Sequence, residues 1–135
     1  MSSKNEINKD NNTSATKRLI IKKDGAKPVG PYSPALEFGN LIFISGQIPD
    51  SLDADIKVQT RECLGKIKGY LKVSGLNMDN ILRCEVYLED LNDFAEMNGV
   101  YAEFFKEPYP TRVTVGGLKI VKNAKIEISA IAGKF

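Results

Sequence analysis

Histidine is absent from this 135-residue chain, and cysteine occurs only twice, as Cys63 and Cys84. Without imidazole, the chain can form no Ser-His or Cys-His nucleophile pair, no imidazole metal site and no imidazole acid–base catalyst. Two cysteines are too few for a structural zinc site, and we expect no metal and no other cofactor. Any catalysis must therefore use carboxylates, arginine, hydroxyl groups, the backbone and water.

Long apolar runs are also absent, since none approaches the ~20 residues of a membrane-spanning helix. The N-terminal segment lacks the apolar core of a secretory signal, and two cysteines suit reduced, buried thiols, so we expect a cytoplasmic protein. The net charge of +2 comes from residues 1–27, which carry seven basic and three acidic residues, whereas the remainder carries 12 basic and 14 acidic. The folded part thus lacks the basic stripe of a nucleic-acid-binding domain, and we expect no nucleic-acid partner.

Residues 1–17 are rich in Asn, Lys and Ser, which predicts a disordered tail ahead of one domain at 18–135. Hydrophobic periodicity predicts a strand, a hairpin, a helix, a strand, a helix and two strands, at 18–23, 36–48, 55–74, 81–88, 92–105, 109–117 and 124–132. This order predicts an α+β fold in which two helices cover one face of a mixed sheet. Scattered aliphatic side chains on the other face favour an oligomer.

Three local features add to this outline. The helix at 55–74 has a stripe of core-facing residues that includes Cys63, which argues against Cys63 as a nucleophile. Residues 28–35 hold three prolines and Tyr32, and form either a pocket wall or a plain connector. Gly46 ends a predicted strand, where a ligand could approach the backbone.

The strand at 109–117 carries an arginine where a buried strand would carry an aliphatic residue. Alternation places Val113 and Val115 on one face, which we expect to be the core face, and Arg112 and Thr114 on the other. We expect the last two strands to be neighbours, so that Arg112, Thr114 and Glu127 share the face away from the helices. Pattern alone favours a salt bridge or solvated charges there. The alternative is a site in which Arg112 grips a carboxylate and Glu127 polarises a water.

Five motifs, in order, resemble those of the RidA/YjgF family of reactive-intermediate deaminases. They are Gly-Pro-Tyr-Ser-Pro-Ala at 30–35, Ser-Gly-Gln-Ile-Pro at 45–49, Asp-Leu-Asn-Asp-Phe at 90–94 with Asn98, Pro-Thr-Arg-Val-Thr-Val at 110–115, and Ile-Glu-Ile-Ser-Ala-Ile-Ala at 126–132. The resemblance spans residues 18–133. It implies a chorismate-mutase-like α+β fold, assembled as a homotrimer around a central barrel, with three clefts between subunits.

The resemblance also implies a function. Family members hydrolyse 2-imino acids, and their 2-aminoacrylate-type enamine tautomers, to 2-oxo acids and ammonia. It implies that Arg112 binds the substrate carboxylate and Glu127 positions water. It further implies that Tyr32 and Asn98 line the cleft, and that Gly46 contributes its backbone.

Two departures from the family pattern bear on substrate range. Thr114 stands where many members have cysteine, and Pro34 stands where the family has glutamine. The resemblance leaves two other functions open: an endoribonuclease or translation inhibitor, which is a label the family also carries, and a non-catalytic trimer that binds small metabolites. The lack of a basic stripe and of aromatic-basic platforms argues against the endoribonuclease.

Overall fold

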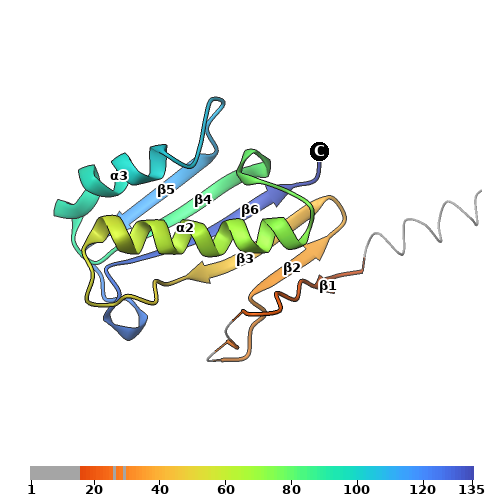
Figure 1. Cartoon of the computed structure of the whole chain (residues 1–135), viewed down its shortest axis with the longest axis horizontal. Coiled ribbons are helices and arrows are strands. Elements are labelled where there is room, and N and C mark those ends of the chain that lie inside the picture. Colours follow the sequence, from red (N-terminus) through yellow and green to blue (C-terminus); the bar gives the residue numbers. More distant parts are fainter. Residues whose placement is uncertain (1–15, 26, 29) are drawn as a thin grey trace, which may run out of the picture.

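In the part of the chain that the computed structural model describes (residues 16–25, 27–28 and 30–135), a six-stranded mixed sheet forms one layer and two helices form the other (Figure 1). The elements are β1 (Arg18–Leu19), β2 (Ala35–Phe38), β3 (Leu41–Gln47), α2 (Ile56–Val73), β4 (Ile81–Leu88), α3 (Phe94–Ala102), β5 (Thr111–Gly116) and β6 (Ile126–Gly133). The predicted α+β two-layer architecture is confirmed. Of the tail predicted at 1–17, residues 1–15 lie outside the described residues.

Helix α2 carries the apolar stripe that its sequence predicts. Its N-terminus is capped by Asp55, whose Oδ1 accepts a hydrogen bond from the Val58 N–H at 2.9 Å. All seven side chains of the predicted stripe are buried: Ile56, Thr60, Cys63, Leu64, Ile67, Tyr70 and Leu71. Burial raises the pKa of the Cys63 thiol, so this cysteine is a core residue and not a nucleophile.

Helix α3 is shorter than the predicted span of 92–105. A 3₁₀ turn at Leu91–Asp93 precedes it, and Asp90 caps this turn by accepting a hydrogen bond from the Asn92 N–H at 2.9 Å. The side chain of Asp93, the residue directly before the helix, makes no cap hydrogen bond. The chain therefore turns tightly before the helix begins, because the capping carboxylate lies three residues earlier than Asp93.

Two strand predictions are confirmed in detail. The β2–β3 hairpin turns at Gly39, whose φ of 59° is in the left-handed region that glycine adopts without strain. In β6, Ile126, Ile128 and Ala130 are buried against the helices, as their alternation predicts.

The strand order β1-β2-β3-β6-β4-β5 corrects the prediction that the last two strands are neighbours. Strand β4 lies between them and pairs parallel with β5 and antiparallel with β6. The pairing of β4 with β5 is parallel because helix α3 connects them as a crossover, and a crossover connection makes the two strands parallel. Strand β6 then returns between β3 and β4.

This order also changes which residues share a face of the sheet. Arg112 and Thr114 pair in register with Cys84 and Val86, which are completely buried under the helices. Glu127 lies on the opposite, open face, because both of its neighbours along β6 are completely buried. The expectation that Arg112, Thr114 and Glu127 share the open face is therefore wrong.

The valines of β5 are on the open face and not in the core. Val113 and Val115 are 40% and 41% exposed, and Phe43 of β3 is 41% exposed. Alternation separates the two sets of side chains on a strand but does not say which set meets the helices. On this edge strand the helix side belongs to Arg112, so the sheet has an uncovered apolar face.

Candidate functional site

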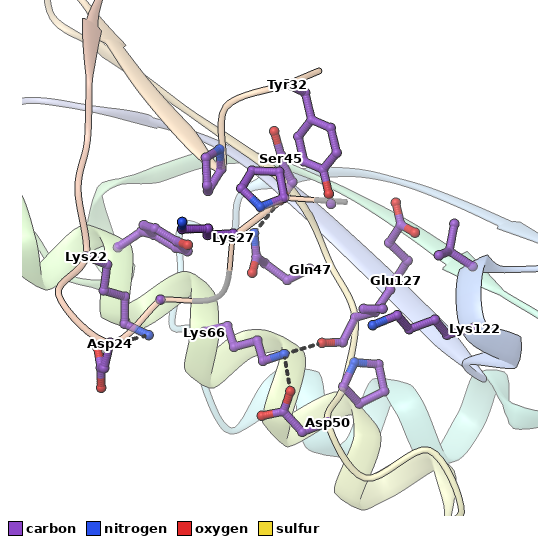
Figure 2. Close-up of a pocket in the computed structure, with 18 of the residues that line it drawn as sticks. Lys22, Asp24, Lys27, Tyr32, Ser45, Gln47, Asp50, Lys66, Lys122 and Glu127 are labelled. Atoms are coloured by element: carbon purple, nitrogen blue, oxygen red, sulfur yellow. Dashed lines mark hydrogen bonds and ion pairs between the residues drawn. The ribbon is translucent and has the colours of Figure 1, made fainter. Parts of the chain in front are cut away.

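A pocket of about 780 Å³ lies where the end of β3 meets the start of β6 (Figure 2). Three of the predicted site residues, Tyr32, Gly46 and Glu127, line it together with Lys66 and Lys122. We call this the Glu127 pocket. Its volume is in the range of small-molecule sites.

Glu127 is the carboxylate of this pocket that has no protein partner among the described residues. The other two carboxylates form ion pairs, Asp24 with Lys22 and Asp50 with Lys66. Glu127 is half-buried, and burial raises the pKa of its carboxyl group above the ordinary value. A partly desolvated carboxylate with free oxygen atoms can hold a water molecule and accept its proton.

Gly46 is needed next to this carboxylate for reasons of space. A Cβ atom at Gly46 would overlap the carboxyl group of Glu127, so any side chain there would displace it. The neighbouring residue ties the proline-rich loop to β3: the Ser45 Oγ donates to the Ser33 carbonyl at 2.6 Å, and the Ser45 N–H donates to the Pro34 carbonyl at 2.9 Å. These bonds make the loop a pocket wall, with Tyr32 half exposed at the opening.

Lys66 and Lys122 also line the pocket, and sequence analysis did not single out either. The Lys66 Nζ donates to the Ile48 carbonyl at 2.7 Å and to Asp50 at 2.8 Å, which fixes the chain after β3. Lys122 extends toward the pocket in Figure 2 from a turn in which both it and Asn123 have φ of 58°. A left-handed lysine costs about 1–2 kcal/mol, and the only sequence signal for this turn is the asparagine.

Arg112, Thr114 and Asn98 lie in a second group, which we call the Arg112 cluster, together with Phe94 and Tyr101. The Arg112 guanidinium carbon is 4.8 Å from the centre of the Tyr101 ring and 5.7 Å from that of Phe94. No carboxylate among the described residues forms an ion pair or hydrogen bond with Arg112. Its positive charge is therefore not neutralised by a carboxylate of this part of the chain, and its N–H donors can bind an anion.

Two buried oxygen atoms of this cluster make no hydrogen bond of standard geometry among the described residues: the Asn98 Oδ1, and the Tyr101 Oη, which lies near the Cys84 thiol and the Arg112 guanidinium. Such atoms are rare in folded proteins, because a buried polar atom without a partner costs about 1–3 kcal/mol. Burial also raises the pKa of the Tyr101 hydroxyl. The cluster is thus a partly buried polar site whose hydrogen-bonding groups are not all satisfied.

Sequence analysis missed the contact of Phe94 and Tyr101 with Arg112. Phe94, Asn98 and Tyr101 have the i, i+4, i+7 spacing of one helix face, which is a signal that they would act together. Cys84, the register partner of Arg112, was also missed. It is completely buried, and burial raises the pKa of its thiol.

The structure therefore divides the predicted site residues into two incomplete halves. Tyr32, Gly46 and Glu127 line the pocket, whereas Asn98, Arg112 and Thr114 lie on the helix side of the sheet edge. Among the described residues, no group of three or more Cys, Asp or Glu side chains could hold a metal ion. No helix in this part of the chain is long and apolar enough to span a membrane.

A fold of two helices on a mixed sheet, with these motifs, defines a known class of proteins. The chain superimposes on the crystal structure of Escherichia coli TdcF with bound serine with a TM-score of 0.81 and 36% identity, covering 87% of this chain and 99% of that chain. Residues 23–134 match the family model described as endoribonuclease L-PSP. The chain belongs to this family, the RidA/YjgF family, as its five motifs indicate.

Two curated relatives show how close the similarity is. A RutC family protein of Pyrococcus horikoshii is 45% identical over 124 residues, which cover 87% of this chain and 98% of the relative. A 2-iminobutanoate/2-iminopropanoate deaminase of Dermatophagoides farinae is 33% identical over 121 residues, which cover 85% and 94%. Relatives of this family that are named as deaminases are thus similar to almost the whole folded domain.

Proposed function

We propose that this protein is a deaminase that hydrolyses reactive 2-imino acids to 2-oxo acids and ammonia. The substrates are 2-iminopropanoate, with its tautomer 2-aminoacrylate, and 2-iminobutanoate. One observation carries the proposal: within the described part of the chain, neither the half-buried carboxylate of Glu127 nor the guanidinium of Arg112 has a partner of opposite charge. The similarity to a protein named 2-iminobutanoate/2-iminopropanoate deaminase supports it.

The active site forms between two copies of the chain. Glu127 and Arg112 are on opposite faces of one sheet, so a small substrate needs the Glu127 pocket of one copy and the Arg112 cluster of the next. An interface that joins two different surfaces is heterologous, and such interfaces form a ring when the rotation between copies closes. The exposed Phe43, Val113 and Val115 on the open face of the sheet support such contacts. We take the ring to be the homotrimer that the family resemblance implies.

In each cleft, Arg112 binds the substrate carboxylate through paired N–H donors. Glu127 orients a water molecule, which attacks C2 of the imine and gives a tetrahedral carbinolamine. Glu127 passes the proton taken from the water to the imine nitrogen, and it then moves the hydroxyl proton of the carbinolamine to the same nitrogen, so that ammonia leaves as the C2–N bond breaks and the C2=O bond forms. The imine is already electrophilic, so positioning and charge supply much of the rate enhancement. No thiol takes part, and threonine at position 114 is compatible with this reaction.

The test is an assay of imine decay. A purified threonine dehydratase generates 2-iminobutanoate from threonine, and semicarbazide traps the imine that remains. We expect the parent protein to lower the trapped fraction in proportion to its concentration. We expect the Arg112→Ala variant to lose at least about a hundredfold in kcat/KM, because the carboxylate is no longer bound or oriented.

The control is Arg61→Ala, because Arg61 is an exposed arginine on α2 that pairs with Glu103. We expect it to have the activity of the parent. Equal activity of the Arg112→Ala variant and the parent would overturn the assignment. Binding of 2-oxobutanoate without any turnover of the imine would indicate a metabolite-binding protein instead.

A further inference from the structure

Arg112 owes its orientation to aromatic rings, and this is unusual for an arginine of this protein. Arg18 and Arg61 pair with Glu37 and Glu103 at 3.3 and 3.0 Å. The guanidinium of Arg112 instead lies over the faces of two rings of α3. A ring face attracts a cation without using any of its five N–H donors. The contact therefore orients the group and leaves its hydrogen-bonding edge free.

We propose that Tyr101 is a positioning residue for carboxylate recognition, and that its ring holds Arg112 in place together with the ring of Phe94. We call Tyr101 and Phe94 the aromatic seat. The inference rests on the proposed function, in which Arg112 binds the substrate carboxylate. It adds that aromatic rings orient this arginine in advance. A carboxylate partner would instead compete with the substrate for the N–H donors of the guanidinium.

Tyr101 is the main part of the seat. Its ring is the closer of the two to Arg112, and it is only 6% exposed, whereas Phe94 is 40% exposed. A second aromatic contact fixes it, since the Phe105 ring centre is 4.6 Å away at a tilt of 38°. Cation–π contacts are stronger when the ring and the cation are shielded from water. Loss of the Tyr101 ring should therefore free Arg112 to adopt other rotamers.

The hydroxyl group is not the part of Tyr101 that the seat needs. The Oη atom is buried near the Cys84 thiol and the Arg112 guanidinium but makes no hydrogen bond of standard geometry with either, so we expect its removal to cost less than removal of the ring. Phenylalanine at this position keeps the ring face and its stacking on Phe105. The Tyr101→Phe and Tyr101→Leu variants thus separate the contribution of the ring to binding from that of the hydroxyl group.

The experiment is an NMR titration of 2-oxobutanoate, the proposed product, into the assembled protein, so that no turnover is needed. We expect Tyr101→Leu to weaken binding about tenfold, which corresponds to 1.4 kcal/mol. We expect Tyr101→Phe to bind within about threefold of the parent. In the imine assay, Tyr101→Leu should raise KM and change kcat little, because the same carboxylate contact exists in ground and transition states.

Two further variants serve as a control and as a substitute for Tyr101→Leu. Phe104→Leu removes a partly buried ring near the end of α3 that has no cation–π contact with Arg112, and it should bind as the parent does. If Tyr101→Leu does not fold, Phe94→Leu takes its place. We expect it to weaken 2-oxobutanoate binding about threefold, because that ring is farther from Arg112 and more exposed to solvent.

The outcomes distinguish the two proposals. If Arg112→Ala binds 2-oxobutanoate as tightly as the parent, the carboxylate contact of the proposed function is wrong. If Arg112→Ala loses binding while Tyr101→Leu keeps it, only the aromatic seat is overturned. Equal losses in Tyr101→Phe and Tyr101→Leu would also overturn the seat, because they would assign the effect to the hydroxyl.

Discussion

The Glu127→Gln variant is expected to lose about 10²–10⁴-fold in kcat for imine hydrolysis, the usual contribution of a general base. Glutamine has the shape of glutamate and can still hydrogen-bond a water molecule, but it cannot take the proton of that water. KM should change little, because substrate binding depends on Arg112. The variant should be at least as stable to heat as the parent, since burial opposes the charge on Glu127 at neutral pH.

The pH dependence of kcat provides the control for this variant. Burial raises the pKa of Glu127 above its ordinary value of 4.5, and the substrate carboxylate neutralises the nearby guanidinium in the complex. The parent should therefore lose activity as the pH falls through a midpoint above 4.5, as Glu127 becomes protonated. The residual activity of Glu127→Gln should lack this acid limb. The same limb in both proteins would show that another group is the base.

The Val113→Asp variant is expected to abolish activity without altering either proposed catalytic residue. Val113 lies on the open face of β5 and is 40% exposed, and the proposed ring has a neighbouring copy at this face. An unpaired carboxylate buried in that contact costs about 3–5 kcal/mol per chain. Sedimentation should then find chains of 14.9 kDa in place of an assembly of about 45 kDa. Circular dichroism should show the secondary structure of the parent.

A matched control exists on the helix layer. Val58 of α2 is also 40% exposed, and the Val58→Asp variant introduces the same charge away from the open face. It should keep both the assembly and the activity. A Val113→Asp variant that dissociates yet hydrolyses imine as fast as the parent would show that one chain suffices.

Local sequence patterns predicted the elements that depend on neighbouring residues. The stripe of α2, the turn at Gly39 and the alternation of β6 follow from periodicity and from glycine's freedom, and the structure confirms them. The long-range pairing of β4 with β6 does not follow from such patterns, because no local signal says which strands are neighbours. The error in strand order then placed Arg112 and Glu127 on the same face.

The valines of β5 illustrate a second limit. Val113 and Val115 form an apolar strand face, and such a face has the same sequence pattern whether helices or another molecule covers it. Their partial exposure became visible only in the structure. The motifs named Arg112 and Glu127 as partners, but their separation in one chain could not be predicted, because it depends on the register of three strands.

In the proposed ring, each active site takes Glu127 from one chain and Arg112 from another, and assemblies that mix two variants show whether this is so. The Arg112→Ala and Glu127→Gln variants, each strongly impaired alone, would be unfolded together in equal amounts and refolded. In randomly mixed rings, about a quarter of the clefts join an intact Glu127 to an intact Arg112. Recovery of about a quarter of the parent's activity is the predicted result. Activity no higher than that of the two variants refolded separately would contradict the account.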